Sequence, residues 1–198
     1  DRIMAKNIIV SNRLPIQLTK IGNSFQFTPT SGGLATGMNS VHKGQKSLWI
    51  GWPGINNDQI DKKTLDPLKK SLEREGYFPV SLSHKEIEDF YYGLSNKSLW
   101  PLFHYFIEFS FFDEKQWKSY QKVNQKFAEN VLLNVEEGDT VWIHDYQLLL
   151  CPKMIKDVRP DITIGFFLHI PFPSFEIFRI FPCREPLLEG MLGADLIG

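Results

Sequence analysis

The chain has 198 residues, of which 42% are hydrophobic and 23% are charged, as expected for a globular domain that buries its core without disulfide staples. Its 22 basic and 23 acidic residues leave a net charge of −1, which excludes a general attraction to nucleic acid or to an anionic membrane. We also expect no transmembrane span and no secretory signal, since no apolar run reaches about 18 residues.

The two cysteines, Cys151 and Cys183, follow no metal-ligand spacing. The chain is also neither small nor rich in cysteine, unlike proteins that depend on disulfides. We therefore expect reduced thiols in a cytoplasmic protein.

Seven short apolar runs predict strands, and several of them are apolar throughout. They lie at residues 7–11, 25–27, 47–50, 77–80, 140–143, 162–168 and 194–197. A strand that is apolar throughout is typical of a parallel sheet that is covered on both faces.

The segments between these strands carry the periodicity of helices. The clearest lies at 114–133, where apolar side chains from Trp117 to Val131 recur every three or four residues. Other helices are expected at 34–41, 62–75, 84–91, 148–158, 176–178 and 185–192. Residues 96–106 are predicted to be irregular. Together the elements predict an α/β fold, a Rossmann-like parallel sheet with helices on both faces.

Four of the predicted strands end in polar or small residues, and the carboxyl ends of parallel strands meet at one edge of a sheet. The residues at these ends are Ser11, Asn12, Arg13, Gly51, Trp52, His144, Asp145 and His169. We therefore expect side chains that are distant in sequence to converge on one crevice.

The residues at this edge allow a phosphate site, although each also has a simpler interpretation. Arg13 carries a planar guanidinium suited to phosphate or carboxylate, but it could be an ordinary surface arginine. Gly32 and Gly33 precede an expected helix and could present backbone N–H groups to a diphosphate, or form a plain turn. No G-x-G-x-x-G dinucleotide fingerprint is present.

Asp145 could accept hydrogen bonds from sugar hydroxyls or cap the following helix, and the two roles are compatible. His144 is expected to be structural. His169 ends a strand and is followed by Pro171 and Pro173, a placement that favours a ligand contact over a core histidine.

Tyr92 and Trp100 could border a sugar pocket or belong to the core. The spacing reveals no acid–base pair, no nucleophile–base pair and no metal cluster. The residues alone therefore predict a crevice compatible with phosphate and a polyol, on the edge of a parallel sheet.

Seven ordered motifs extend over nearly the whole chain. They are SNRLP at 11–15, SGGLATG at 31–37, WIGWPG at 49–54, YYGLSNKSLWPLFHY at 91–105, VWIHDYQLLLCP at 141–152, GFFLHIPFPSFEIFR at 165–179 and LLEGMLGADLIG at 187–198. In these motifs the chain closely resembles the N-terminal half of the trehalose-6-phosphate synthase family.

The resemblance implies a GT-B glycosyltransferase, in which residues 1–198 are the N-terminal, acceptor-side Rossmann-like domain and the C-terminal donor-binding domain is absent from this chain. It implies transfer of glucose from UDP-glucose to glucose 6-phosphate with retention of configuration, giving trehalose 6-phosphate and UDP, without a cofactor or metal. The chain alone is then expected to be inactive. A homo-oligomer and a trehalose synthase complex both stay open.

By the same resemblance, Arg13 binds the phosphate of glucose 6-phosphate, Tyr92 and Trp100 close around that substrate, and Asp145 hydrogen-bonds its sugar. Trp52 helps to shape this acceptor pocket.

On the donor side, the resemblance implies that Gly32 and Gly33 form the loop against UDP-glucose. His169 contacts the sugars near the reacting centre, where it and Asp145 position groups and stabilise charge, without either acting as a nucleophile.

Two alternatives remain at this point. One is a non-catalytic, synthase-like domain of a regulatory subunit or of a trehalose-phosphate phosphatase. The other is a different sugar-nucleotide transferase with the same architecture. An active synthase is favoured because Arg13, Tyr92, Trp100, Asp145 and His169 are all present.

Overall fold

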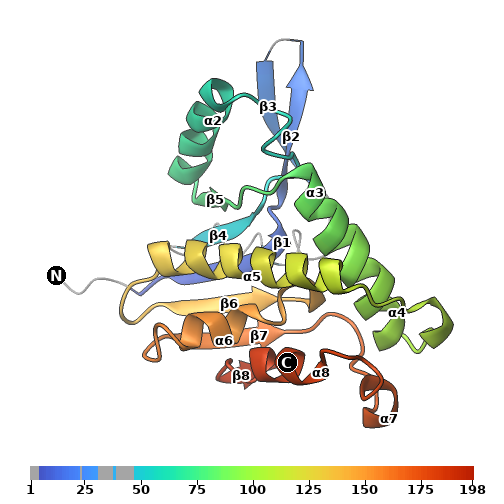
Figure 1. Cartoon of the computed structure of the whole chain (residues 1–198). Coiled ribbons are helices and arrows are strands. Elements are labelled where there is room, and N and C mark those ends of the chain that lie inside the picture. Colours follow the sequence, from blue (N-terminus) through green and yellow to red (C-terminus); the bar gives the residue numbers. More distant parts are fainter. Residues whose placement is uncertain (1–4, 23, 31–37, 39–46) are drawn as a thin grey trace.

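A computed structural model of the chain describes residues 5–22, 24–30, 38 and 47–198. Its main sheet has six parallel strands in the order β5-β4-β1-β6-β7-β8 (Figure 1). These strands are β1 (Asn7–Arg13), β4 (Ser47–Trp52), β5 (Tyr77–Pro79), β6 (Thr140–His144), β7 (Thr163–Phe167) and β8 (Leu196–Ile197). The predicted parallel sheet is confirmed.

Counted along the chain within this sheet, the strand order is 3-2-1-4-5-6, the order of doubly wound folds. The order reverses direction between β1 and β6, which lie side by side in the middle of the sheet. Ligands of such folds bind outside the carboxyl ends of the strands at this switch point.

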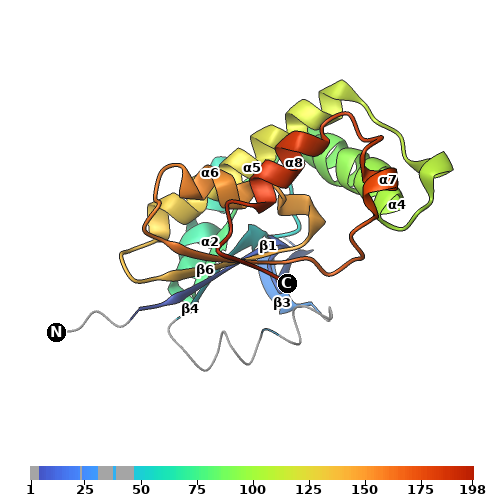
Figure 2. The ribbon, with the colours of Figure 1, turned by 90° about the horizontal axis from the view of Figure 1, so that it is seen from below.

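Both faces of the sheet are covered, as predicted. Helices α5 (Glu114–Asn134), α6 (Cys151–Lys156) and α8 (Arg184–Met191) lie on one face of the sheet (Figure 2). Ile8 and Val10 pack in the same core cluster as side chains of these helices. Ile9 points to the opposite face. Its cluster includes side chains from β4, from β2 and from α2 (Lys62–Arg74), namely Trp49, Ile16 and Leu72.

An antiparallel hairpin of β2 (Ile16–Ile21) and β3 (Ser24–Pro29) is inserted between β1 and β4. The sequence analysis predicted only residues 25–27 of it. Ile16 and Leu18 are buried and Gln17 between them is exposed, so the alternation of a strand was present but short.

Residues 84–103 form a continuous helical segment made of α3 (His84–Glu86), the π-helical η1 (Ile87–Leu99) and α4 (Trp100–Phe103). The expectation of irregular structure is therefore wrong for residues 96–103. Trp100 and Pro101 suggest a bend in the sequence, but Pro101 stands in the first turn of α4, where proline is tolerated. Gly93 suits close packing on α5, because a Cβ atom there would collide with the Gln116 side chain.

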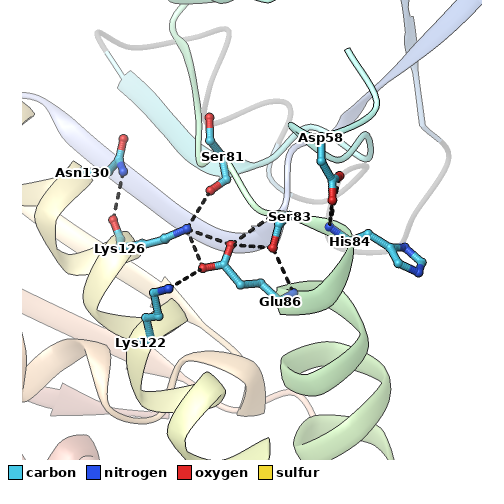
Figure 3. Close-up of polar contacts among 8 residues, drawn as sticks. All are labelled: Asp58, Ser81, Ser83, His84, Glu86, Lys122, Lys126 and Asn130. Atoms are coloured by element: carbon cyan, nitrogen blue, oxygen red, sulfur yellow. Dashed lines mark hydrogen bonds and ion pairs between the residues drawn. The ribbon is translucent and has the colours of Figure 1, made fainter. Parts of the chain in front are cut away.

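The N-terminal end of this helical segment is attached to α5 by charge (Figure 3). Ser83 and Glu86 form a capping box, in which the Ser83 hydroxyl accepts from the Glu86 backbone and the Glu86 carboxylate accepts from the Ser83 backbone. Lys126 of α5 lies 2.6 Å from Glu86 Oε1 and also donates to the Ser81 carbonyl. Lys122 lies 3.5 Å from the same carboxylate.

The remaining helical turns are η2 (Ile107–Phe109), η3 (Tyr146–Leu148) and α7 (Phe175–Phe178). The helix predicted at 148–158 is split, since residue 148 belongs to η3 and α6 starts three residues later. The expected helix at 34–41 lies outside the described residues, apart from Met38. Within the described ranges, no helix is long and apolar enough to cross a membrane.

Candidate functional site at the switch point

The carboxyl ends of β4, β1, β6 and β7 are neighbours along one edge of the sheet, as the sequence analysis predicted. Arg13 is paired in register with Trp52 across β1 and β4. On the other side of the switch point, the Asp145 backbone N–H donates to the Phe167 carbonyl and joins the ends of β6 and β7. The candidate site therefore lies where the strand order reverses.

Arg13 is exposed, and its guanidinium lies 5.2 Å from the centre of the Trp52 ring. Its Nη2 atom also occupies the space that a side chain on Gly54 would fill, and Gly54 has a positive φ of 84° that suits glycine. None of the ion pairs in the described part of the chain includes Arg13. Its N–H groups are therefore available to an anionic ligand.

The register between β1 and β4 shifts between Val10 and Arg13, where a short chain of hydrogen bonds joins the two strands. Trp49 Nε1 donates to Ser11 Oγ over 2.8 Å, and Ser11 Oγ donates to the Arg13 carbonyl over 2.6 Å. The two backbones come so close that a Cβ on Gly51 would lie 2.8 Å from Leu14 N. Gly51 is thus required for the position of Arg13.

Asp145 has an unusual backbone, with φ of 77° and ψ of 170°. This region is populated almost entirely by glycine, and a residue with a side chain held there stores about 1–3 kcal/mol of strain. The Asp145 carboxylate accepts from the Tyr146 backbone N–H over 3.0 Å, so its expected capping role is confirmed for η3. The strain indicates that this carboxylate is held in place for more than a cap.

The same carboxylate reaches across to β7, where Oδ1 accepts from the His169 backbone N–H over 3.3 Å. Burial raises the pKa of the Asp145 carboxyl above its ordinary value, against the lowering effect of the N–H groups of Tyr146 and His169. Partly buried carboxyl groups with a perturbed pKa are typical of functional sites.

His144 and His169 form a pair, with 3.0 Å between His144 Nδ1 and His169 Nε2. His144 is only 1% exposed, while the His169 ring is open to solvent. Burial, with repulsion from His169, lowers the pKa of His144 to about 4, so its ring is neutral near pH 7. The structural role expected for His144 is confirmed, with His169 as its partner.

Tyr92 and Trp100 lie on the helical segment 84–103. This segment lies beside the carboxyl ends of β6 and β7 (Figure 1). Tyr146 Oη joins this segment to the edge by donating to Asn96 Oδ1 over 2.9 Å. Tyr92 is 49% exposed and Trp100 is 39% exposed, so neither ring belongs to the core. One face of Trp100 is already stacked on His104, with ring centres 3.9 Å apart.

Gly32 and Gly33, the predicted donor loop, lie outside the described residues. The sequence analysis missed Gly54 beside Arg13, and it missed the bond between Tyr146 and Asn96. Gly54 follows Trp52 and Pro53 directly, so its place in the WIGWPG motif was the available signal. The Tyr146–Asn96 contact joins residues 50 positions apart and left no local signal.

The edge therefore combines a guanidinium without an ion-pair partner among the described residues, a partly buried carboxylate and a paired imidazole, on a doubly wound sheet. A guanidinium binds phosphate through parallel N–H donors, and a carboxylate accepts from hydroxyl groups. This set suits a phosphorylated sugar, placed where doubly wound folds bind their ligands.

Comparison with known proteins agrees with this assignment. The sequence model described as glycosyltransferase family 20 matches residues 5–198, and the chain belongs to this family. An alpha,alpha-trehalose-phosphate synthase (UDP-forming) of Botryotinia fuckeliana is 43% identical over 196 residues. The alignment covers 96% of this chain and 37% of the fungal protein, so the chain spans less than two fifths of that relative.

Two solved structures are also similar. The Escherichia coli protein described as trehalose-6-phosphate bound with UDP-2-fluoro glucose has a TM-score of 0.78 and 31% identity, covering 98% of this chain and 39% of that one. A UDP-forming synthase of Burkholderia xenovorans in complex with glucose 6-phosphate has a TM-score of 0.76 and 26% identity, covering 98% and 40%. The six-stranded parallel fold thus agrees with that of these enzymes.

Proposed function

We propose that the full-length protein containing this chain is a retaining, UDP-forming trehalose-6-phosphate synthase, and that residues 1–198 are its acceptor-side domain. The observation that carries the proposal is the guanidinium of Arg13, which is stacked on Trp52 and free of carboxylate partners in the described part of the chain. It stands at the switch point of a family 20 fold, across from Asp145.

In this proposal Arg13 binds the phosphate of glucose 6-phosphate through charge-assisted hydrogen bonds. Asp145 accepts a hydrogen bond from a hydroxyl of the acceptor sugar. Tyr92 and Trp100 close around the same sugar from the neighbouring helical segment. Trp52 holds the Arg13 guanidinium over its ring. Tyr92 and Trp100 are both exposed, and sugar rings pack well against aromatic side chains.

The donor, UDP-glucose, would lie between this domain and a C-terminal domain beyond residue 198. Gly32 and Gly33 would form the loop against it, and His169 would contact the sugars near the reacting carbon. The C-terminal domain supplies the remaining contacts to the diphosphate, so this chain is one wall of a site for two substrates.

In the reaction, the bond between C1 of the donor glucose and the diphosphate breaks, and a bond forms from C1 to the anomeric oxygen of glucose 6-phosphate. The proton of that hydroxyl passes to a donor phosphate oxygen, and UDP leaves. Attack on the face from which UDP departs retains the configuration. His169 and Asp145 act by positioning and by charge stabilisation, since no nucleophile is required.

We place the protein in the cytoplasm, in line with its two cysteines, which form no disulfide with each other in the structure. The proposed partners are the two small-molecule substrates and the C-terminal domain of the same polypeptide. Assembly into a homo-oligomer or a trehalose synthase complex is a further possibility that gel filtration of the full-length protein would test.

The proposal is tested by incubating the full-length protein with UDP-glucose and glucose 6-phosphate. We expect UDP release that depends on glucose 6-phosphate, and a phosphorylated disaccharide with both anomeric centres in the α configuration, identified by NMR. The isolated 198-residue chain should show no turnover, because half of the site is missing.

A folded full-length protein that releases no UDP with these substrates would instead support the non-catalytic alternative. Release of UDP with a different acceptor would support another sugar-nucleotide transferase. Turnover by the isolated chain would contradict the division of the site between two domains.

A further inference from the structure

The pair of His144 and His169 carries an inference that the proposed roles do not contain. The two nitrogens are 3.0 Å apart, so one of them donates a proton and the other accepts with its lone pair. Which nitrogen holds the proton decides what the exposed His169 ring can offer to a sugar.

The environment of His144 decides the direction of this hydrogen bond. Its second nitrogen, Nε2, is buried and has no hydrogen-bond partner among the described residues. A buried N–H without a partner is rarer in proteins than a buried acceptor without one. The proton of the neutral His144 ring is therefore on Nδ1, where it has a partner, and Nε2 keeps its lone pair.

We propose that His144 is a positioning residue that donates its Nδ1–H to His169 Nε2 and thereby fixes the tautomer of His169. The lone pair of His169 Nε2 is then occupied, and the proton of that ring sits on Nδ1. His169 presents an N–H donor to the crevice and cannot take a proton from the acceptor through Nε2.

Neighbouring contacts hold His169 in this position. Its backbone N–H donates to Asp145 Oδ1, and its ring lies 4.7 Å from the ring of Phe167. The His144 ring is in turn held beside Trp142, with ring centres 4.9 Å apart. Both imidazoles are thus held in place, one at the end of β6 and the other just beyond the end of β7, so the hydrogen bond between them keeps one geometry.

The tautomer is measured directly on the 198-residue chain labelled with ¹⁵N-histidine. Two-bond ¹⁵N–¹H correlations distinguish protonated from lone-pair ring nitrogens, and the His144 and His169 signals are assigned from single variants. We expect a protonated Nδ1 and a lone-pair Nε2 on both residues near neutral pH. A protonated Nε2 on His169 would overturn the proposal.

Two variants of His144 separate positioning from simple packing. In His144→Asn, the side-chain amide can place an N–H where Nδ1 was, so His169 should keep its Nδ1–H tautomer. In His144→Leu, a side chain of similar size has no donor, and the ring nitrogens of His169 should show the averaged signals of exchanging tautomers. An unchanged His169 spectrum in a folded His144→Leu chain would also overturn the proposal.

The catalytic consequence rests on the proposed function and is measured in the full-length protein. We expect His144→Leu to lower kcat/KM about tenfold and His144→Asn to keep it within about threefold. If the protein has no synthase activity, the NMR experiment still tests the tautomer of His169 by itself. If activity is present and the two variants are equal, the positioning role is wrong.

Discussion

Asp145 is held in the folded chain at a cost that its capping bond does not offset. Its backbone lies in a region that favours glycine, and burial raises the pKa of its carboxyl. For an acid, a folded pKa above the unfolded value means that the ionised group opposes folding at neutral pH. Such a residue is expected where function, and not stability, determines the side chain.

Substitution of Asp145 should therefore separate stability from function. Asp145→Gly removes the side chain and the strain, and we expect its free energy of unfolding to exceed that of Asp145→Ala by about 1–3 kcal/mol. Asp145→Ala keeps the strain and loses the cap. Both should lower kcat/KM for glucose 6-phosphate at least tenfold. Urea unfolding of the chain gives the first comparison, and equal stability of the two variants would contradict the strain.

At the residue scale, the sequence was sufficient to predict which side chains lie at the carboxyl ends of the strands. The placement of Arg13, Asp145 and His169 along one edge of the sheet was predicted, because each follows an apolar run in a parallel sheet. The pairing of His144 with His169, and the strain at Asp145, depend on tertiary geometry. They left no trace in residue type or spacing.

At the scale of elements, the helical segment that carries Tyr92 and Trp100 depends on its attachment to α5 (Figure 3). Burial raises the pKa of Glu86, but Lys126, the Ser83 backbone N–H and Lys122 lower it by more, so the pKa lies below its ordinary value of 4.5. The ionised carboxylate therefore stabilises the fold at neutral pH. That contribution is lost as the pH falls from about 4.5 through the lower folded value.

We expect Lys126→Met to lower the free energy of unfolding by about 1–2 kcal/mol at pH 7, between the values of exposed and buried ion pairs. The difference from wild type should shrink as the pH falls below the ordinary carboxyl pKa of 4.5 and Glu86 becomes protonated. Lys122→Met is the matched control, because Lys122 is more exposed and farther from Glu86, and it should cost less than about 0.5 kcal/mol. A pH-independent difference would contradict the ion pair as the cause.

Helices and strands were predicted correctly where the apolar residues follow one clear periodicity. Helix α5 was predicted to within one residue, and the apolar strands of the main sheet were found. The hairpin of β2 and β3 was largely missed because its alternation is short. The expectation for residues 96–103 was wrong because Trp100 and Pro101 suggest a bend, whereas Pro101 stands in the first turn of α4, where proline is tolerated.

At the scale of the whole molecule, the chain is a doubly wound domain whose candidate site opens along one edge of the sheet (Figure 1). It covers 37% of a curated relative that is named for the complete synthase. The residues proposed for glucose 6-phosphate all lie in this chain, whereas most contacts to UDP-glucose are assigned to the domain beyond it. A substitution at the proposed acceptor site of this chain should therefore change the KM for glucose 6-phosphate more than the KM for UDP-glucose.

The most direct measurement is the KM of the full-length protein for each substrate after Arg13→Ala. Loss of a charge-assisted phosphate contact of about 1.5–3 kcal/mol should raise the KM for glucose 6-phosphate about 10- to 150-fold. The KM for UDP-glucose should stay within about threefold. Arg159→Ala, which breaks an ion pair with Asp161 before β7, is the control and should change neither value. A wild-type KM for glucose 6-phosphate in Arg13→Ala would contradict the account.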